Sequence, residues 1–233
     1  MTESSSAFSG LIDMITDPAK AMRAADNHPK RMWLPFILSI VLPCIFVAYY
    51  FSVVDMEWMF QQTQAQAIAN GGEMPDEARA FMTSGIMMGS ALAGTVIVVS
   101  IMTAISAVYF LMVSKFTTED TRGFGAWFSM SAWAGVPGIL AALLMIIYFA
   151  VAGNSQMGME DVTFFSLNSL AMHYPSGSPQ AGFYNAITPF MLWSLFLLAV
   201  GLKTWTGRTM GKSLMIAAAP YVVMFGIYGA MVL

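Results

Sequence analysis

The sequence has very little charge and a single cysteine. Asp, Glu, Lys and Arg make up 10% of its 233 residues, whereas an average soluble domain has roughly 25%. One cysteine, Cys44, provides neither a disulfide framework nor a metal site of paired cysteines, and we expect it to be a small buried apolar side chain. The net charge of −3 and the lack of any basic block argue against nucleic-acid binding.

Catalytic motifs are missing as well. The sequence has no GxGxxG loop, no Walker loop, no HExxH and no GxSxG. Its two histidines, His28 and His173, fall on opposite sides of the membrane in the topology derived below, so they cannot share a metal ion or a base. No Asp, Glu, Lys, Arg or His lies inside a predicted span, although proton-coupled carriers and intramembrane proteases generally need such a residue. We therefore predict a protein that is not an enzyme and has no cofactor.

Long apolar runs are abundant. Hydrophobic residues make up 58% of the chain, and the mean hydropathy is +0.67. The run from Trp33 to Val54 has no charged residue and, at about 1.5 Å per residue, reaches about 33 Å as a helix, which is enough to cross a bilayer core. Four further runs follow at 85–113, 126–152, 183–202 and 213–233. These runs predict an all-α fold, a polytopic membrane bundle of five transmembrane helices.

The basic residues predict the orientation of this bundle. Only Arg79 falls on one side of the five-span topology, and nine of the ten basic residues fall on the other. These nine are Lys20, Arg23, Lys30, Arg31, Lys115, Arg122, Lys203, Arg208 and Lys212. The positive-inside rule therefore places the N-terminus inside and the C-terminus outside.

Residues 1–32 precede the first span, and we treat them as a cytoplasmic amphipathic segment apart from the transmembrane domain, residues 33–233. Apolar residues recur at helical spacing from Phe8 onwards, and Asp17-Pro18 is typical of the cap and first turn of a second helix, which we predict over 18–26. Both helices are expected to lie along the membrane surface. A solvated, partly frayed tail is the alternative.

Two polar loops are predicted on the outer side. In residues 55–84, Pro75 and the acids beside it predict the start of a helix that continues through the second span, so the group Glu73, Asp76 and Glu77 is most simply a solvated helix start. In the second loop, residues 161–170 predict a short helix lying on the membrane.

Prolines and small residues mark the spans. Kinks are predicted at Pro43, Pro137, Pro189 and Pro220, each of which frees a carbonyl group within a span. Hydroxyl groups of the second span are candidates to line a cavity in the kinked bundle, or simply to bond the backbone: Ser100, Thr103, Ser106 and Tyr109. The spacing of Gly85, Gly89 and Ala93 predicts close helix packing, within the chain or between two copies in a homo-oligomer.

Two stretches carry a family resemblance. They are FTTEDTRGFGAWFSMSAWAGVPGIL (116–140) and MLWSLFLLAVGLKTWTGRTMGKSLMIAAAP (191–220), and both follow an amphipathic lead into a basic first span. The chain resembles the bacterial branch of the Yip domain family, whose eukaryotic members are Rab-GTPase-interacting proteins of the secretory pathway. Pro137 and the approach to the basic turn through Trp193, Gly201 and Leu202 match best. The resemblance implies a five-helix, multi-pass protein of the bacterial cytoplasmic membrane.

We predict a non-enzymatic scaffold or adaptor whose cytoplasmic face engages a protein partner or anionic membrane lipid. The candidate contacts are Lys115, Arg122, Lys203, Arg208 and Lys212. The alternative is a passive channel or lipid-handling protein that uses the proline-kinked bundle.

Overall fold

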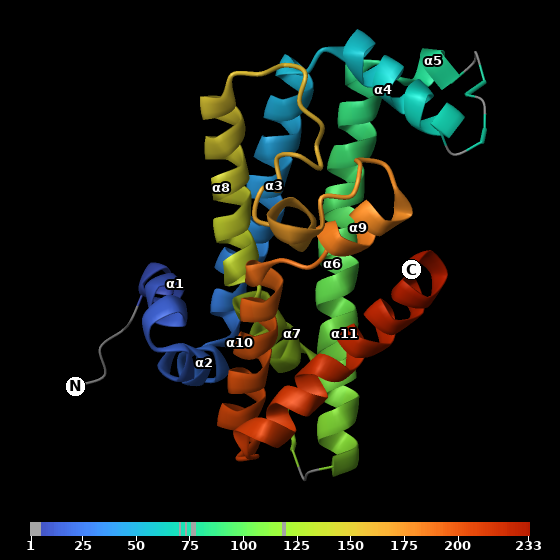
Figure 1. Cartoon of the computed structure of the whole chain (residues 1–233). Coiled ribbons are helices and arrows are strands. Elements are labelled where there is room, and N and C mark those ends of the chain that lie inside the picture. The colour runs from blue at the N-terminus through green and yellow to red at the C-terminus, as the bar shows by residue number, and fades with distance from the viewer. Residues whose placement is uncertain (1–5, 70, 73, 76–77, 118–119) are drawn as a thin grey trace. The chain divides into compact units, whose positions relative to one another are not determined.

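The computed structural model describes residues 6–69, 71–72, 74–75, 78–117 and 120–233 (Figure 1). Within these ranges the secondary structure is helical and contains no strand. Five helices are long and apolar enough to cross a membrane: Pro29–Val53, Ser84–Phe116, Phe124–Ala152, Pro189–Thr206 and Met210–Val232. The prediction of an all-α protein with five membrane-spanning helices is confirmed.

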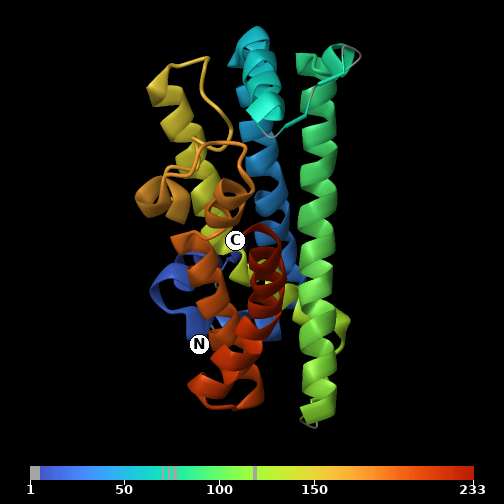
Figure 2. The same cartoon turned by 45° about the vertical axis from the view of Figure 1, so that its right-hand side comes forward.

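The chain divides into two compact units, which we describe separately. Unit 1 comprises Met1–Val41, Ile97–Leu140 and Phe190–Met224. Unit 2 comprises Leu42–Val96, Ala141–Pro189 and Phe225–Leu233. The divisions fall within long helices, so α3 (Trp33–Val53), α6 (Ser84–Thr117), α8 (Val136–Ala152) and α11 (Met210–Val232) contribute residues to both. Helix α6 runs unbroken in both views of Figures 1 and 2.

Unit 1 begins with two short helices, as the sequence predicts. In α1 (Ala7–Thr16) the N-cap is Ser6, and in α2 (Pro18–Asn27) it is Asp17, whose carboxylate accepts a hydrogen bond of 3.0 Å from the Lys20 N–H. Their apolar faces pack onto α7 (Phe124–Ala134), and Met14 and Met22 are fully buried. Both helices are confirmed, while their place on the membrane surface remains a prediction.

The unit 1 part of α6 carries a stripe of exposed apolar side chains. The stripe comprises Ile97, Ile101, Ile105, Val108 and Met112, each between 44% and 55% exposed. Their spacing of three and four residues places them on one face of the helix. In a bilayer such a face contacts lipid chains, which explains why it is left uncovered within the chain.

Proline positions differ from the predicted kinks. The third span consists of two helices that meet at Gly135, and Pro137 is the second residue of α8. The fourth span, predicted over 183–202, starts instead with Pro189 as the first residue of α10 (Pro189–Thr206). The prediction that Pro189 lies inside a helix is therefore wrong: a first-turn proline lacks only an N–H group that would be unbonded there anyway. Pro43 and Pro220 do lie within their helices.

Unit 2 contains helices that the sequence analysis did not predict. The first polar loop includes α4 (Met56–Ala69), and α9 (Pro179–Asn185) precedes α10. The continuous helix predicted from Pro75 is wrong, because α5 (Ala78–Phe81) ends before α6 begins at Ser84; Glu73, Asp76 and Glu77 lie outside the described residues. The short helix predicted over 161–170 is also wrong, because that stretch forms turns and then a π-helical turn at Asn168–Met172.

Aromatic packing forms the core of unit 2. The Phe149 ring lies 5.3 Å from Tyr50 and 5.4 Å from Tyr49, measured between ring centroids. Phe46, Phe51 and Val162 are buried in the same cluster. The Ser84 hydroxyl donates a hydrogen bond of 2.6 Å to the Phe51 carbonyl, which joins the start of α6 to α3.

Candidate functional site

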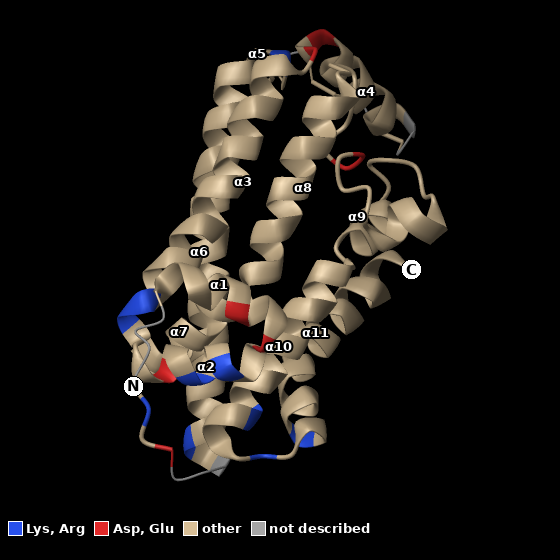
Figure 3. Cartoon of the chain, turned by 90° about the vertical axis from the view of Figure 1, so that its left-hand side faces the viewer, with Lys and Arg blue, Asp and Glu red and all other residues tan. Residues whose placement is uncertain are grey.

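The two units differ in the sign of their charge. Counted over the sequence, unit 1 has nine basic and six acidic residues, a net charge of +3, whereas unit 2 has one basic and seven acidic residues, a net charge of −6. Figure 3 shows the basic residues of unit 1 around α2, at the end of α6 and along the turn from α10 to α11. The candidate site is therefore on unit 1.

Five basic side chains of unit 1 are exposed and have no ion pair among the residues that the structure describes. We call them the basic surface; they are Arg23, Lys30, Lys115, Lys203 and Lys212. Lys20 differs from them, because its ammonium group pairs with Asp13 at 3.1 Å. Three of the five predicted contact residues, Lys115, Lys203 and Lys212, thus project cations that an anionic partner could reach.

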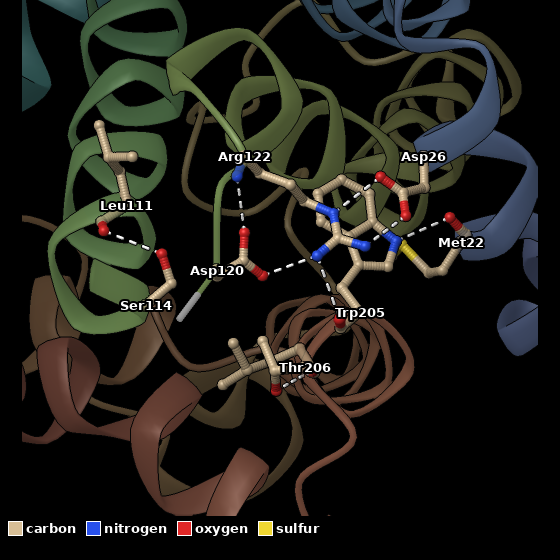
Figure 4. A network of polar contacts seen from close by, with 9 residues as sticks. Met22, Asp26, Leu111, Ser114, Asp120, Arg122, Trp205 and Thr206 are labelled. Atoms are coloured by element: carbon tan, nitrogen blue, oxygen red, sulfur yellow. Dashed lines mark hydrogen bonds and ion pairs between the residues drawn. The ribbon is translucent and has the colours of Figure 1, made fainter. Parts of the chain in front are cut away.

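The other two predicted contacts are engaged within the protein. Arg122 donates two hydrogen bonds to the Asp26 carboxylate, from Nε at 2.8 Å and from Nη2 at 2.6 Å (Figure 4). Its Nη1 group lies 2.6 Å from Asp120 Oδ2 and donates to the Trp205 carbonyl at 3.1 Å. Arg208 is half-buried and also engaged. The guanidinium group of Arg122 therefore links segments of unit 1 to one another and is not a free cation.

The Asp26 carboxylate gives Arg122 an electrostatic environment that favours its charge. Hydrogen bonding to Asp26, followed by the attraction of the Asp26 and Asp120 charges, holds the pKa of the Arg122 guanidinium above its ordinary value against the cost of burial. Bidentate contacts of this kind are short and directional. Arg122 is therefore positively charged at neutral pH, as arginine is in proteins generally.

Trp205 takes part in the same network of contacts around Arg122, which we call the junction. Its ring lies 5.2 Å from the Arg122 guanidinium carbon and 5.4 Å from the Trp127 ring, and its Nε1–H donates to the Met22 carbonyl at 2.8 Å. The indole is only 6% exposed, so this hydrogen bond is shielded from water. The network ties α2, the segment before α7 and the end of α10 together, and so fixes the framework that carries the basic surface.

A hollow of about 600 Å³ opens beside this junction. We call it the α2–α10 groove; one wall comes from the turn between α1 and α2, and the other comes from α10 and the start of α11. Its lining includes the basic residues Arg23 and Lys203, the acid Asp17, and the apolar residues Phe196 and Val200. This groove was not predictable from the sequence, because its walls are about 180 residues apart along the chain.

A second, more apolar hollow of about 220 Å³ lies between α6, α10 and α11 in unit 1. At its edge the Tyr109 hydroxyl donates a hydrogen bond of 2.8 Å to the carbonyl of Ile216. This is the carbonyl that loses its helical partner because Pro220, four residues later, has no N–H group. Tyr109, one of the hydroxyl residues predicted either to line a cavity or to bond the backbone, does both.

Unit 2 has a hollow of about 530 Å³, which includes Glu160 and Asp161 in its lining. Both carboxylates brace the surrounding loop, since Asp161 accepts a hydrogen bond from the Gly158 N–H at 3.1 Å and Glu160 accepts one from the Gly177 N–H at 3.3 Å. Among the described residues, no group of three His, Cys, Asp or Glu side chains is placed to hold a metal ion.

Comparison with known proteins identifies a family. A family model described as the Yip1 domain matches residues 12–231, from α1 to α11. No curated protein and no solved structure matches the chain. The family resemblance predicted from the sequence is thereby confirmed, while the assignment to its bacterial branch remains a prediction.

Proposed function

Because this chain belongs to the Yip1 domain family and has five apolar helices that make it an integral, multi-pass membrane protein, we propose that it is a non-enzymatic scaffold or adaptor. Its basic surface engages the acidic segment of a protein partner or anionic lipid headgroups. We place this surface on the cytoplasmic side of a bacterial cytoplasmic membrane, following the positive-inside rule.

The observation that carries this proposal is the contrast between engaged and free cations in unit 1. Arg122 satisfies its donors within the junction, whereas the basic surface leaves five cations without an ion pair among the described residues. A cation near an anionic leaflet contributes roughly 1 kcal/mol to membrane attraction. Several such cations on a fixed framework favour binding of an extended anionic surface.

The engagement of the acidic residues supports a role without catalysis. Each Asp and Glu in the described part of the chain holds a hydrogen bond or an ion pair: Asp13, Asp17, Asp26, Asp55, Glu57, Asp120, Glu160 and Asp161. Carboxylates used in this way cap helices and brace loops. These contacts give each of the eight carboxylates a structural role.

Site-directed photo-crosslinking tests the proposal in intact membranes. A crosslinking amino acid is placed at Lys115, Lys203 or Lys212, and at the matched exposed cation of unit 2, Arg79. We expect one discrete acidic protein, or crosslinks to anionic lipid, at the three unit 1 positions and neither at Arg79. Equal crosslinking at all four positions would show that the basic surface is not selective and would contradict the proposal.

The apolar hollow supports a second candidate, the handling of lipid within unit 1. Apolar side chains of α6, α10 and α11 line it, and the Tyr109 hydrogen bond leaves the Ile216 carbonyl satisfied beside it. We expect a bulky Ala217→Leu variant to slow lipid transfer between the leaflets of a reconstituted vesicle, because Ala217 lines the hollow. Transfer equal to that of protein-free vesicles, in the unmodified protein, would remove this candidate.

A further inference from the structure

We propose that the α2–α10 groove is a specific binding site for one anionic phospholipid, with Arg23 and Lys203 as ligands of its phosphate. This inference rests on the proposed function, because it needs the basic surface to lie at the level of the lipid headgroups. It deepens that function by naming one ligand and one place for it.

The charges of the groove fit an anion. Arg23 on α2 and Lys203 on α10 line it together, both are exposed, and neither has an ion pair among the described residues. The acid that faces them, Asp17, is engaged as the N-cap of α2 through its hydrogen bond from the Lys20 N–H. An incoming phosphate thus meets two free cations and one carboxylate that is already bonded.

The order of residues along α10 fits a lipid better than a free anion. Phe196, Val200 and Lys203 follow one another at helical spacing and line the same groove. At about 1.5 Å per residue, Phe196 lies about 10 Å along the axis from Lys203, towards the middle of the span. A phospholipid has the same order, with its phosphate at the membrane surface and its acyl chains towards the middle of the membrane. Inorganic phosphate has no apolar part that could contact Phe196 and Val200.

The volume of the groove and the contacts that join its walls also favour a bound lipid. Its volume of about 600 Å³ suits a headgroup and the adjoining glycerol and upper chain segments, because small-molecule sites typically enclose about 300–1,000 Å³. Its two walls are joined by the hydrogen bond from Trp205 on α10 to Met22 on α2. Arg122 joins them as well, because it bonds both Asp26 on α2 and the Trp205 carbonyl. The groove therefore keeps its form without a ligand, which reduces the ordering cost of binding.

Native mass spectrometry of the full chain in detergent tests the proposal. Phosphatidylglycerol is titrated against phosphatidylcholine, and the double variant Arg23→Gln/Lys203→Gln is compared with Lys20→Gln/Arg79→Gln, which removes the same charge outside both the groove and the basic surface. We expect one phosphatidylglycerol to bind the unmodified protein in preference to phosphatidylcholine. The groove variant should lose about ten- to a hundredfold in affinity, and the control variant should lose little.

Two further measurements separate the outcomes. Inorganic phosphate at millimolar concentration should not displace the lipid, and Phe196→Ala should weaken lipid binding, because the apolar wall contributes to binding. Displacement of the lipid by phosphate would show an anion site only and overturn the proposal.

Unchanged lipid affinity in the groove variant would overturn the proposal too, while leaving the basic surface intact as an adaptor. Loss of the crosslinked partner in Lys115→Gln/Lys212→Gln, with phosphatidylglycerol binding retained, would place the partner on the part of the basic surface outside the groove and leave the lipid site standing. Circular dichroism confirms that each variant remains helical.

Discussion

Arg122 shows how a single charged residue can be structural where its sequence position suggests binding. It lies in a charged turn between two spans, where the positive-inside rule predicts headgroup contact. Its guanidinium instead bonds Asp26, which lies 96 residues away in the chain, and Asp120 in the same turn. Partial burial strengthens these bonds, because the guanidinium is only 27% exposed and water screens it weakly.

Replacement of Arg122 should destabilise unit 1. We expect Arg122→Ala to lower the free energy of unfolding by about 2–3 kcal/mol, because it leaves Asp26 and Asp120 without their charged partner. Unfolding in mixed micelles, followed by tryptophan fluorescence, measures the change. The matched control is Arg79→Ala. Arg79 forms an ion pair with Glu57 in which both side chains are exposed, so its loss should change the free energy of unfolding little. Equal effects of the two substitutions would contradict the structural role of Arg122.

Tyr109 and Pro220 form a second pair whose meaning appears only in three dimensions. The proline leaves the Ile216 carbonyl without its helical donor, and the tyrosine hydroxyl of α6 supplies the missing hydrogen bond at 2.8 Å. An unsatisfied carbonyl is costly within a membrane, so the two residues depend on each other.

A double-mutant cycle measures this dependence. Tyr109→Phe should cost about 1 kcal/mol, because it leaves the Ile216 carbonyl unsatisfied. In a Pro220→Ala background the alanine N–H can restore the helical bond, so the same Tyr109→Phe change should cost clearly less. Additive effects of the two substitutions on unfolding in micelles would show that they are independent and would contradict this account.

At the scale of elements, long apolar runs and local capping were predictable, and breaks hidden inside apolar stretches were not. Asp17-Pro18 marks the start of α2 in the sequence, and the structure confirms it. The run over 183–202 contains no charged residue, so its mean hydropathy does not reveal that α9 ends at Asn185 and α10 begins at Pro189. Helix α4 was missed because it lacks a clear apolar face, although Asp55 is a capping signal.

The start of α4 should depend on pH. Hydrogen bonds from the Gln156 side chain and then from the Trp58 N–H hold the pKa of Asp55 below its ordinary value. Since the folded pKa is lowered, this stabilisation is present above the unfolded value of about 4 and is lost as the pH falls through the folded value. Amide exchange of α4, corrected for intrinsic rates, should therefore rise at low pH in the unmodified protein and change less in Asp55→Asn. The same acid response in both proteins would exclude Asp55 as its source.

The docking of α1 on α7 should depend on a glycine. A Cβ atom at Gly10 would lie 2.6 Å from Cη2 of the Trp133 ring, so even alanine must displace α1 from that ring, which is 3% exposed. We expect Gly10→Ala to increase proteolytic cleavage between α1 and α2. Gly125→Ala is the matched control, because the space around Gly125 is open. Equal resistance of the two variants to proteolysis would show that α1 accommodates the added methyl group and stays packed on α7.

At the scale of the whole molecule, the division of charge between the two units is the feature on which the proposed function depends. Lys115, Lys203 and Lys212 are exposed in the structure, while their contact with a partner or a lipid stays a prediction. The sequence alone lists the basic residues. It could not predict that Arg122 is engaged by Asp26, or that Arg23 and Lys203 line one groove, because these pairs are distant in the chain and meet only through folding. A single sequence therefore does not reveal which residues of the site, distant in the chain, lie side by side in the fold.

Native mass spectrometry of the protein extracted with its own lipids shows whether the basic surface retains an anionic ligand. The unmodified chain is compared with Lys115→Glu/Lys203→Glu/Lys212→Glu, which reverses three exposed cations and leaves Arg122 untouched. We expect the unmodified protein to retain an acidic protein or an anionic phospholipid that the variant loses, while membrane insertion is unchanged. An identical set of retained molecules in both proteins would contradict the proposed function.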